Sequence, residues 1–265
     1  MAQYIAGFIG AGNMGGALAA AACKAVSPEK IVITDRDEAK TTALSARTGC
    51  IVSDSATVVQ HSRFVFLGVK PQMLSAVAKE LKPLFTERVV IVSMLAGVTT
   101  ERIAAELGDM PIIRIMPNTP AAIGEGMILY TANHAVTEAE KNDFVQLLSQ
   151  AGQLDEIAES LIDAGSAVSG CGPAFVYLFV EALADAGVQC GLPRDKALQY
   201  AAQTVCGAGR MAVVDGRHPA ALKDAVCSPG GSTIEGVKVL DKKNFGEITK
   251  SAVAASFART KELGK

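Results

Sequence analysis

The chain has 265 residues, of which 49% are hydrophobic and 20% are charged, and its formal net charge is −2. This composition is typical of a folded globular protein with one large or two ordinary domains, and it excludes a disordered chain. The near balance of charge argues against a nucleic-acid-binding surface, which normally carries a basic excess.

Targeting segments, membrane spans and metal sites are not expected either. No basic segment followed by an apolar stretch opens the chain, and no apolar run reaches the ~18 residues of a membrane span. The six cysteines form no CxxC pair, and His61, His134 and His218 show no metal-ligand spacing. We therefore expect a cytoplasmic protein with reduced thiols, no metal and no membrane association.

Short β-branched runs alternate with amphipathic stretches in the first half of the chain. Strands are predicted at 4–9, 31–34, 64–69, 89–95 and 112–116, and helices between them at 13–25, 37–47, 72–82 and 99–107. Extended pieces at 126–131 and 153–157 flank a further helix around 137–150. This alternation predicts βαβ units, and the nearly unbroken apolar strands indicate a parallel sheet that is covered on both faces.

The second half lacks strand signals and is expected to be helical. Helices are predicted at 173–191, 194–214, 218–226 and 232–263. The first of them is apolar around most of its circumference, which favours burial against a second copy of the chain or against the chain's own first domain. We predict a Rossmann-type doubly wound parallel sheet over residues 1–158 and an all-helical domain for substrate binding and dimerisation over 159–265.

A glycine motif, Gly10-x-Gly12-x-x-Gly15, follows the first predicted strand and opens the first predicted helix. In this context the first glycine permits a tight turn and the second lets a pyrophosphate approach the backbone. The third glycine allows close packing of helix on strand, while the helix N-terminus offers N–H groups to phosphates. We predict that this segment binds a dinucleotide.

The end of the second predicted strand bears on the choice of cofactor. Asp35 is placed to grip the ribose hydroxyls of NAD, whereas Arg36 could stack on adenine or pair with the 2′-phosphate of NADP. The two signals conflict, so the preference between NADPH and NADH stays open. Lys70, in the segment Gly68–Pro71, either contacts the cofactor or is a solvated lysine at a helix start.

A second glycine-containing loop, "SPGGST" at 228–233, precedes an apolar helical run. Gly230 and Gly231 expose backbone amides ahead of a helix that starts near Ser232, which is a ready site for a substrate carboxylate. Thr233 can offer a weak hydrogen bond to an amine nitrogen. The alternative is that the loop is only a turn with a helix cap.

The sequence resembles the pyrroline-5-carboxylate reductase family from end to end. The segments that carry the resemblance are "FIGAGNMG", "GVKP", "AGVT", "RIMPNTPA", "SGCGPAFVY" and "LKDAVCSPGGSTIEGV". The resemblance implies reduction of L-1-pyrroline-5-carboxylate to L-proline by NADPH or NADH, the last step of proline biosynthesis. It also implies a homodimer through the helical domain, which in some members assembles further.

The resemblance also implies site residues. Those expected to bind the cofactor are Ile9, Gly10, Ala11, Gly12, Asn13, Met14, Gly15, Asp35, Arg36, Gly68, Val69, Lys70, Pro71, Leu95, Ala96 and Gly97. Those expected to bind the substrate are Glu159, Gly230, Gly231, Ser232 and Thr233, of which Thr233 is the catalytic candidate. Taken by itself, Glu159 would be a solvated residue at a helix start.

The chain departs from the family pattern at a few positions, and two other functions are considered. Asp35 and Arg36 stand where many relatives have small polar residues, Cys171 replaces a serine, and Ser232 stands where threonine or alanine is commoner. One alternative is a dehydrogenase of the 3-hydroxyacid type, with Lys196 or Lys223 as catalytic candidates. The other is a non-catalytic NADP-binding sensor.

Overall fold

The computed structural model describes residues 2–85 and 89–263. By their internal contacts these residues form two compact units. The first comprises the chain up to Cys171 together with the segment from Ser256 onward, and the second is Gly172–Ala255. The predicted domain boundary after residue 158 is not tested by this division and stays a prediction.

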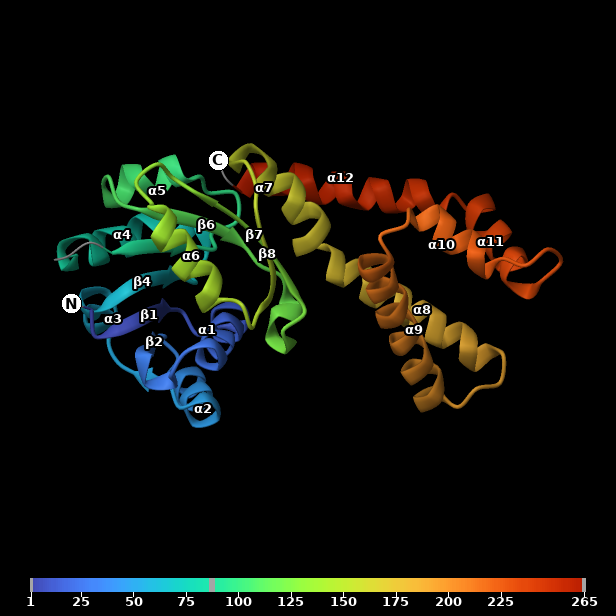
Figure 1. The fold of residues 1–265 in the computed structure, drawn as a ribbon, viewed down its shortest axis with the longest axis horizontal. Coiled ribbons are helices and arrows are strands. Elements are labelled where there is room, and N and C mark those ends of the chain that lie inside the picture. The colour runs from blue at the N-terminus through green and yellow to red at the C-terminus, as the bar shows by residue number, and fades with distance from the viewer. Residues whose placement is uncertain (1, 86–88, 264–265) are drawn as a thin grey trace. The chain divides into compact units, whose positions relative to one another are not determined.

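The first unit is built on an eight-stranded sheet with the order β3-β2-β1-β4-β5-β6-β7-β8 (Figure 1). Neighbouring strands are parallel except β6 and β7, which pair antiparallel. The order of the first six strands is that of a Rossmann fold. The strands are β1 Tyr4–Ile9, β2 Ile31–Thr34, β3 Ile51–Val52, β4 Ser62–Leu67, β5 Val90–Ser93, β6 Ile112–Met116, β7 Gly126–Ala132 and β8 Gly152–Glu156.

Helices cover both faces of this sheet because successive side chains of each strand point to opposite faces. Phe8 and Phe66 point to the face covered by α1, α2 and α6, whereas Val65 and Leu67 point to the face covered by α3, α4 and α5. The helices of this unit are α1 Asn13–Ala25, α2 Glu38–Thr48, α3 Ser55–His61, α4 Leu74–Leu81, α5 Thr100–Leu107, α6 Glu138–Leu147 and α7 Glu159–Gly165. Short 3₁₀ turns lie at Pro28–Lys30, Pro71–Met73, Lys82–Leu84 and Thr119–Ile123.

The predicted elements of this half agree closely with the observed ones, but several short elements, among them β3 and α3, were not predicted. The strand β3 has two residues, both exposed, and α3 has seven. Neither is long enough to give a periodic pattern of apolar residues. The side chain of Asp54 starts α3 by accepting a hydrogen bond from the Thr57 N–H at 2.7 Å, which is an N-cap.

The core of the first unit allows a stability prediction. Phe66 is fully buried and stacks on Phe8 with ring centroids 4.2 Å apart. Replacing Phe66 by alanine is expected to lower the free energy of unfolding by about 3–5 kcal/mol, because it removes buried apolar surface and leaves a cavity. Denaturant unfolding measures this, with Ile123→Ala as the control. Ile123 is 77% exposed, so its truncation should cost less than about 0.5 kcal/mol.

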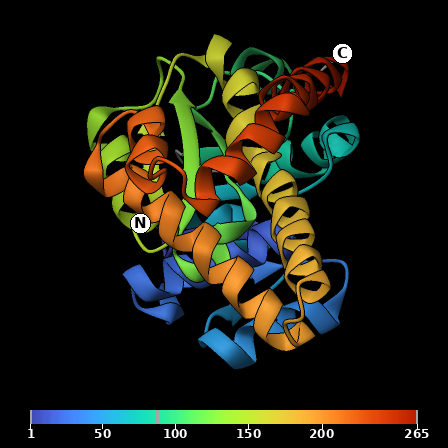
Figure 2. The same ribbon diagram turned by 90° about the vertical axis from the view of Figure 1, so that its right-hand side faces the viewer.

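The second unit is helical, as expected. A π-helical segment, Ser166–Gly170, connects α7 to α8 Gly172–Gln189. α8 is followed by α9 Arg194–Asp215, α10 Pro219–Val226, α11 Ser232–Lys242 and α12 Phe245–Leu263, whose last turns belong to the first unit. α8 and α9 form a hairpin that is visible in Figure 2, and small residues meet between them, among them Ala184, Ala197 and Ala201.

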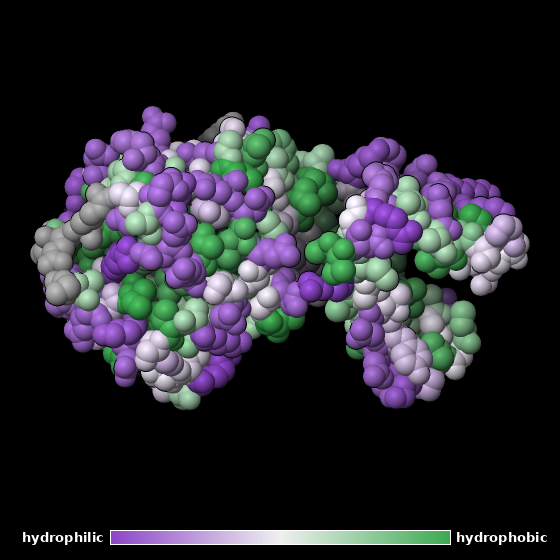
Figure 3. Space-filling model, in the orientation of Figure 1, coloured by the Kyte–Doolittle hydropathy of each residue, from purple (hydrophilic) through white to green (hydrophobic). Residues whose placement is uncertain are grey.

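The helices of the second unit expose many apolar side chains. Figure 3 shows apolar residues interspersed with polar ones on the visible face of these helices. Large exposed examples on α8 are Val176, Tyr177, Leu178, Phe179 and Leu183. A surface of this kind normally marks an interaction site.

One helical stretch within the described residues, Glu159–Gln189, is long and apolar enough to cross a membrane. This corrects the expectation that no segment reaches that length. Only 11% of its most apolar window is buried in the structure. However, Glu159 and Asp163 in its first turns bind Arg114 of β6, so that end of the stretch is fixed to the sheet.

Candidate functional site

The glycine-containing turn after β1 leaves the N-terminus of α1 without a side-chain cap. α1 begins after Gly12, and among the described residues no side chain caps its first N–H groups. By contrast, α2, α3, α5 and α6 are capped by the side chains of Asp37, Asp54, Thr99 and Thr137. The first N–H groups of a helix have no partner within the helix, so those of α1 are available to an anionic ligand.

Contacts around the three glycines agree with their predicted roles. Gly10 has φ of 103°, and a Cβ atom there would lie 2.5 Å from the Gly68 carbonyl oxygen. A Cβ on Gly15 would lie 2.1 Å from the Gly10 carbonyl oxygen, so only glycine allows α1 to pack this closely on the turn. A Cβ on Gly12 would meet no atom within 4 Å, which leaves open space in front of the helix.

Two cavities lie along the carboxyl ends of the strands on either side of this turn, and both are lined by Gly12, Gly68 and Val69. The first cavity, of about 610 Å³, is further lined by Ile9, Gly10, Thr34, Asp35, Arg36, Lys40, Asp54, Ser55, Lys70, Met73, Val77, Glu80 and Leu81. The second cavity, of about 280 Å³, is further lined by Asn13, Met14, Gly15, Met94, Met116 and Pro117. The carboxyl ends of the strands are where a Rossmann fold binds a dinucleotide.

The carboxylate of Asp35 holds the glycine turn. Its Oδ2 accepts a hydrogen bond from the Ala11 N–H at 2.7 Å, and its Oδ1 accepts one from the Asp37 N–H at 2.9 Å. Arg36 is exposed and lines the first cavity, as do Lys40 and Lys70. This end of the site therefore offers three cationic side chains, of which Lys40 also pairs with Asp37 at 3.4 Å.

Glu159 is placed in the first unit and is bound there on both oxygens. Its Oε1 accepts a hydrogen bond from the Thr100 N–H at 2.7 Å, and its Oε2 accepts one from the Thr100 hydroxyl at 2.8 Å. Nη1 of the buried Arg114 lies 3.6 Å from Oε1. The sequence indicated neither partner, and the predicted contact of Glu159 with substrate stays a prediction.

The loop Ser228–Gly231 of the second unit is a tight turn that leads directly into α11. Pro229 and Gly230, the latter with φ of 71°, occupy its centre, and the Gly231 N–H donates to the Ser228 carbonyl oxygen at 3.0 Å. The Gly231 N–H is thus engaged in the turn, which corrects the expectation that it is exposed to a ligand. α11 has no side-chain cap, so the N–H groups of its first residues, Ser232, Thr233 and Ile234, have no partner within the helix, and ligand binding by the Gly230 N–H stays a prediction.

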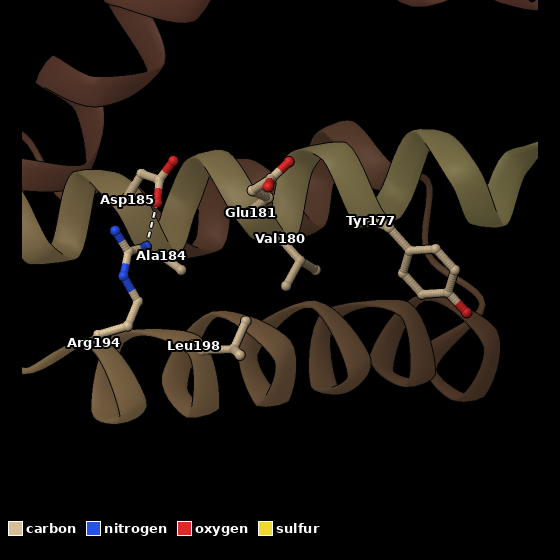
Figure 4. A pocket seen from close by; sticks show the side chains of 7 residues that line it. All are labelled: Tyr177, Val180, Glu181, Ala184, Asp185, Arg194 and Leu198. Atoms are coloured by element: carbon tan, nitrogen blue, oxygen red, sulfur yellow. Dashed lines mark hydrogen bonds and ion pairs between the residues drawn. The ribbon is translucent and has the colours of Figure 1, made fainter.

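A third cavity, of about 530 Å³, lies between α8 and α9 of the same unit (Figure 4). Arg194 of α9 pairs with Asp185 of α8, and Tyr177, Val180, Glu181, Ala184 and Leu198 complete the lining. No group of three or more His, Cys, Asp or Glu side chains among the described residues could hold a metal ion. The cavity is a groove of mixed polarity on an exposed helix pair, and its lining residues carry no metal-binding group.

Comparison with known proteins identifies the family. Residues 159–263 match the family model described as "Pyrroline-5-carboxylate reductase dimerisation", and residues 5–97 match "NADP oxidoreductase coenzyme F420-dependent". The pyrroline-5-carboxylate reductase of Pisum sativum is 41% identical over 98% of this chain and 96% of its own length. The chain belongs to the pyrroline-5-carboxylate reductase family.

Solved structures of this family have the same fold over their whole length. The pyrroline-5-carboxylate reductase of Coxiella burnetii superposes with a TM-score of 0.90 at 33% identity, covering 99% of both chains. The Plasmodium falciparum pyrroline carboxylate reductase, solved with NADP bound, superposes with a TM-score of 0.88 at 30% identity, covering 100% of both chains. The first and second units of this chain thus follow one another in the same order as in these relatives.

Most of the residues implied by the family resemblance line the two cofactor cavities, but some do not. Ile9, Gly10, Gly12, Asn13, Met14, Gly15, Asp35, Arg36, Gly68, Val69 and Lys70 line them. Leu95 is fully buried in the core, and Ala96 packs against the small cluster formed by Met116, Leu129 and Ile162. Ala11, Pro71 and Gly97 line neither of these two cavities, and contact of these five residues with cofactor stays a prediction.

Other lining residues were not predicted from the sequence. Met116 and Pro117 line the second cavity, and Lys40 and Ser55 line the first. Met116 ends β6, which pairs directly with β5. The signal that could have found Met116 and Pro117 is their place at the carboxyl end of a buried parallel strand, where ligands of such sheets bind.

Proposed function

We propose that this protein reduces L-1-pyrroline-5-carboxylate to L-proline with NADPH. The observation that carries the proposal is the full-length similarity to enzymes named for this reaction, at 41% identity to the pea protein. The geometry supports binding of both cofactor and substrate. α1 and α11 each start after a glycine and have no side-chain cap, so the free N–H groups of each helix can bind an anionic group.

In this proposal the first unit binds the dinucleotide. The N–H groups at the start of α1 hold the pyrophosphate beside Gly12, where the space is open. The nicotinamide half lies in the second cavity, against Met94, Met116 and Pro117. When bound there, the reduced cofactor supplies a hydride, and these apolar side chains exclude water from the reacting face.

The loop of the helical unit provides the place for the substrate carboxylate. The N–H groups of Ser232 and Thr233 bind the carboxylate, and the Thr233 hydroxyl orients the ring nitrogen. A protonated C=N bond is already electron-poor, so the reaction needs orientation more than a general acid. His218, the histidine nearest in sequence to this loop, accepts a hydrogen bond on Nδ1 from the Ala220 N–H and so caps α10.

The preference for NADPH rests on the cationic side chains of the first cavity. We propose that Arg36 and Lys40 bind the 2′-phosphate, while Asp35 holds the glycine turn through Ala11 and Asp37. Two observations support this: the match to an NADP oxidoreductase family model, and the solved relative with NADP bound.

Removing one of these charges tests the preference. Arg36→Ala is expected to lower kcat/KM for NADPH by about 10-fold or more and to change that for NADH by less than about 3-fold, because a charged hydrogen bond to phosphate contributes roughly 1.5–3 kcal/mol. Lys79→Ala is the matched control, since Lys79 is an exposed lysine of α4 that lines neither cavity. Equal losses with both cofactors would contradict the role given to Arg36.

We also propose that the helical unit forms a homodimer. The support is the match of 159–263 to a family model for dimerisation and the exposed apolar side chains of α8. A second copy that covers α8 would bury this surface without a membrane. Absence of membrane association, a cytoplasmic location and any higher assembly remain predictions from the sequence.

A direct assay separates this function from its two alternatives. The purified protein is mixed with NADPH, and the loss of NADPH absorbance and the formation of proline are followed after addition of pyrroline-5-carboxylate. We expect oxidation of NADPH with proline formed in equal amount. Oxidation only with a 3-keto acid would indicate a dehydrogenase of the 3-hydroxyacid type, and binding of NADPH without any oxidation would indicate a sensor.

A further inference from the structure

Arg114 is a charged residue in the interior of the first unit. It lies on β6, and its side chain is 1% exposed. Nη2 contacts Asp163 Oδ1 at 2.5 Å, and Nη1 lies 3.6 Å from Glu159 Oε1. Burying a guanidinium is costly unless carboxylates compensate its charge, so the two acidic residues of α7 are held at this place on the sheet.

Glu159 also binds a second helix, α5. Its two oxygens accept hydrogen bonds from the N–H and the hydroxyl of Thr100, the first residue of α5, at 2.7 and 2.8 Å. A carboxylate at a helix N-terminus satisfies an otherwise unpaired N–H group and interacts favourably with the helix dipole. Arg114, Glu159 and Thr100 thus form one chain of contacts from β6 to the start of α5, in which Arg114 and Thr100 are buried and Glu159 is partly exposed.

The start of α5 is the end of the turn that borders the cofactor site. The turn begins after β5 at Met94, which lines the second cavity, and it closes with a hydrogen bond from the Val98 N–H to the Leu95 carbonyl oxygen at 3.3 Å. Gly97 within it has φ of 75°. A turn of only six residues, 94–99, is therefore fixed by β5 at one end and by the Glu159–Thr100 contact at the other.

We propose that Glu159 is a positioning residue for hydride transfer. It acts through Thr100 to hold the turn 94–99 against the nicotinamide half of the cofactor, and Arg114 with Asp163 fixes the orientation of its carboxylate. This role differs from the direct substrate contact predicted from the sequence, since both oxygens of Glu159 already have partners. The proposal rests on the function proposed above and names a residue that acts on the cofactor side of that site.

Glu159→Gln tests the proposal because it keeps the size of the side chain but removes its charge and one acceptor for Thr100. Three properties are measured: the dissociation constant of NADPH, the fluorescence of bound NADPH without substrate, and kcat and KM separately. We expect a dissociation constant within about 3-fold of the wild type, because the pyrophosphate contacts are retained. We expect altered fluorescence and a kcat lower by about 10-fold to 100-fold at unchanged KM for pyrroline-5-carboxylate, because a small misplacement of a reactant slows the reaction by such factors.

Two further variants complete the test. Thr100→Val removes only the hydroxyl contact and should show the same signature in weaker form; it also serves if Glu159→Gln does not fold. Asp143→Asn breaks a half-exposed ion pair with Arg63 on the same unit and should change none of the measured properties.

Each outcome decides between the possible roles of Glu159. A raised KM for pyrroline-5-carboxylate at unchanged kcat and fluorescence would show direct substrate binding and overturn the proposal. Unchanged kcat and fluorescence at a lowered melting temperature would show a purely structural anchor and overturn it as well. Failure of the wild type to oxidise NADPH would count against the proposed function only, since the fluorescence comparison needs no substrate.

Discussion

Replacing Gly12 by valine is expected to weaken NADPH binding by about 100-fold or more while leaving the fold intact. A Cβ at this position meets no protein atom within 4 Å, and Gly12 has φ of −66°, which other residues adopt readily. The added side chain would instead fill the space in front of the α1 N-terminus, where the pyrophosphate is proposed to lie. Loss of two charge-assisted hydrogen bonds at roughly 1.5 kcal/mol each corresponds to a dissociation constant raised by about 100-fold or more.

Calorimetric titration with NADPH and thermal unfolding of the free protein measure the two halves of this prediction. Gly15→Ala is the informative comparison, because its Cβ would lie 2.1 Å from the Gly10 carbonyl oxygen and should destabilise the unit itself. Gly12→Val should therefore lose binding at an unchanged melting temperature, whereas Gly15→Ala should lower the melting temperature. If Gly12→Val bound NADPH as the wild type does, the pyrophosphate would not lie at this helix.

Replacing Thr233 by alanine is expected to lower turnover strongly without affecting cofactor binding. Thr233 is exposed at the second position of α11, in a unit that contributes no residue to the two cofactor cavities. Its hydroxyl is proposed to orient the ring nitrogen, and loss of an orienting contact can cost about 100-fold in rate. Steady-state kinetics with pyrroline-5-carboxylate and titration with NADPH measure the two effects.

Two neighbouring variants serve as controls for Thr233. Thr233→Ser keeps the hydroxyl and should recover most of the turnover. Ser232→Ala should change kcat by less than about 3-fold, because the carboxylate is proposed to bind backbone N–H groups that this substitution retains. A Thr233→Ala variant with wild-type turnover would show that the hydroxyl has no part in orienting the substrate.

The local parts of the fold could be predicted from the sequence. β1 at 4–9, α1 at 13–25 and β6 at 112–116 have the predicted bounds, because long apolar runs and a glycine turn specify them locally. β3 and α3 were missed because elements of two and seven residues give no periodic signal. That β6 and β7 pair antiparallel was not predicted either, since pairing depends on contacts distant in sequence.

The same distinction holds for the site. The turn at Gly10–Gly15 was predicted because its chemistry lies within one short motif. The partners of Glu159 were not predicted. Thr100 is 59 residues away in the sequence, and Arg114 is the one polar residue in an apolar strand, with nothing local to indicate its partner. The hydrogen bond of Gly231 could be predicted in part. Proline followed by glycine is a turn signal, and within that turn the Gly231 N–H donates to the Ser228 carbonyl oxygen.

The most direct test of the account follows the hydride itself. NADPH that carries deuterium at both hydrogen positions of C4 of the nicotinamide is incubated with the protein and pyrroline-5-carboxylate, and the proline formed is analysed by mass spectrometry. Direct hydride transfer to the C=N bond predicts one deuterium per molecule of L-proline, bound to C5. Proline without deuterium, or no proline despite oxidation of NADPH, would contradict hydride transfer to the C=N bond by this protein.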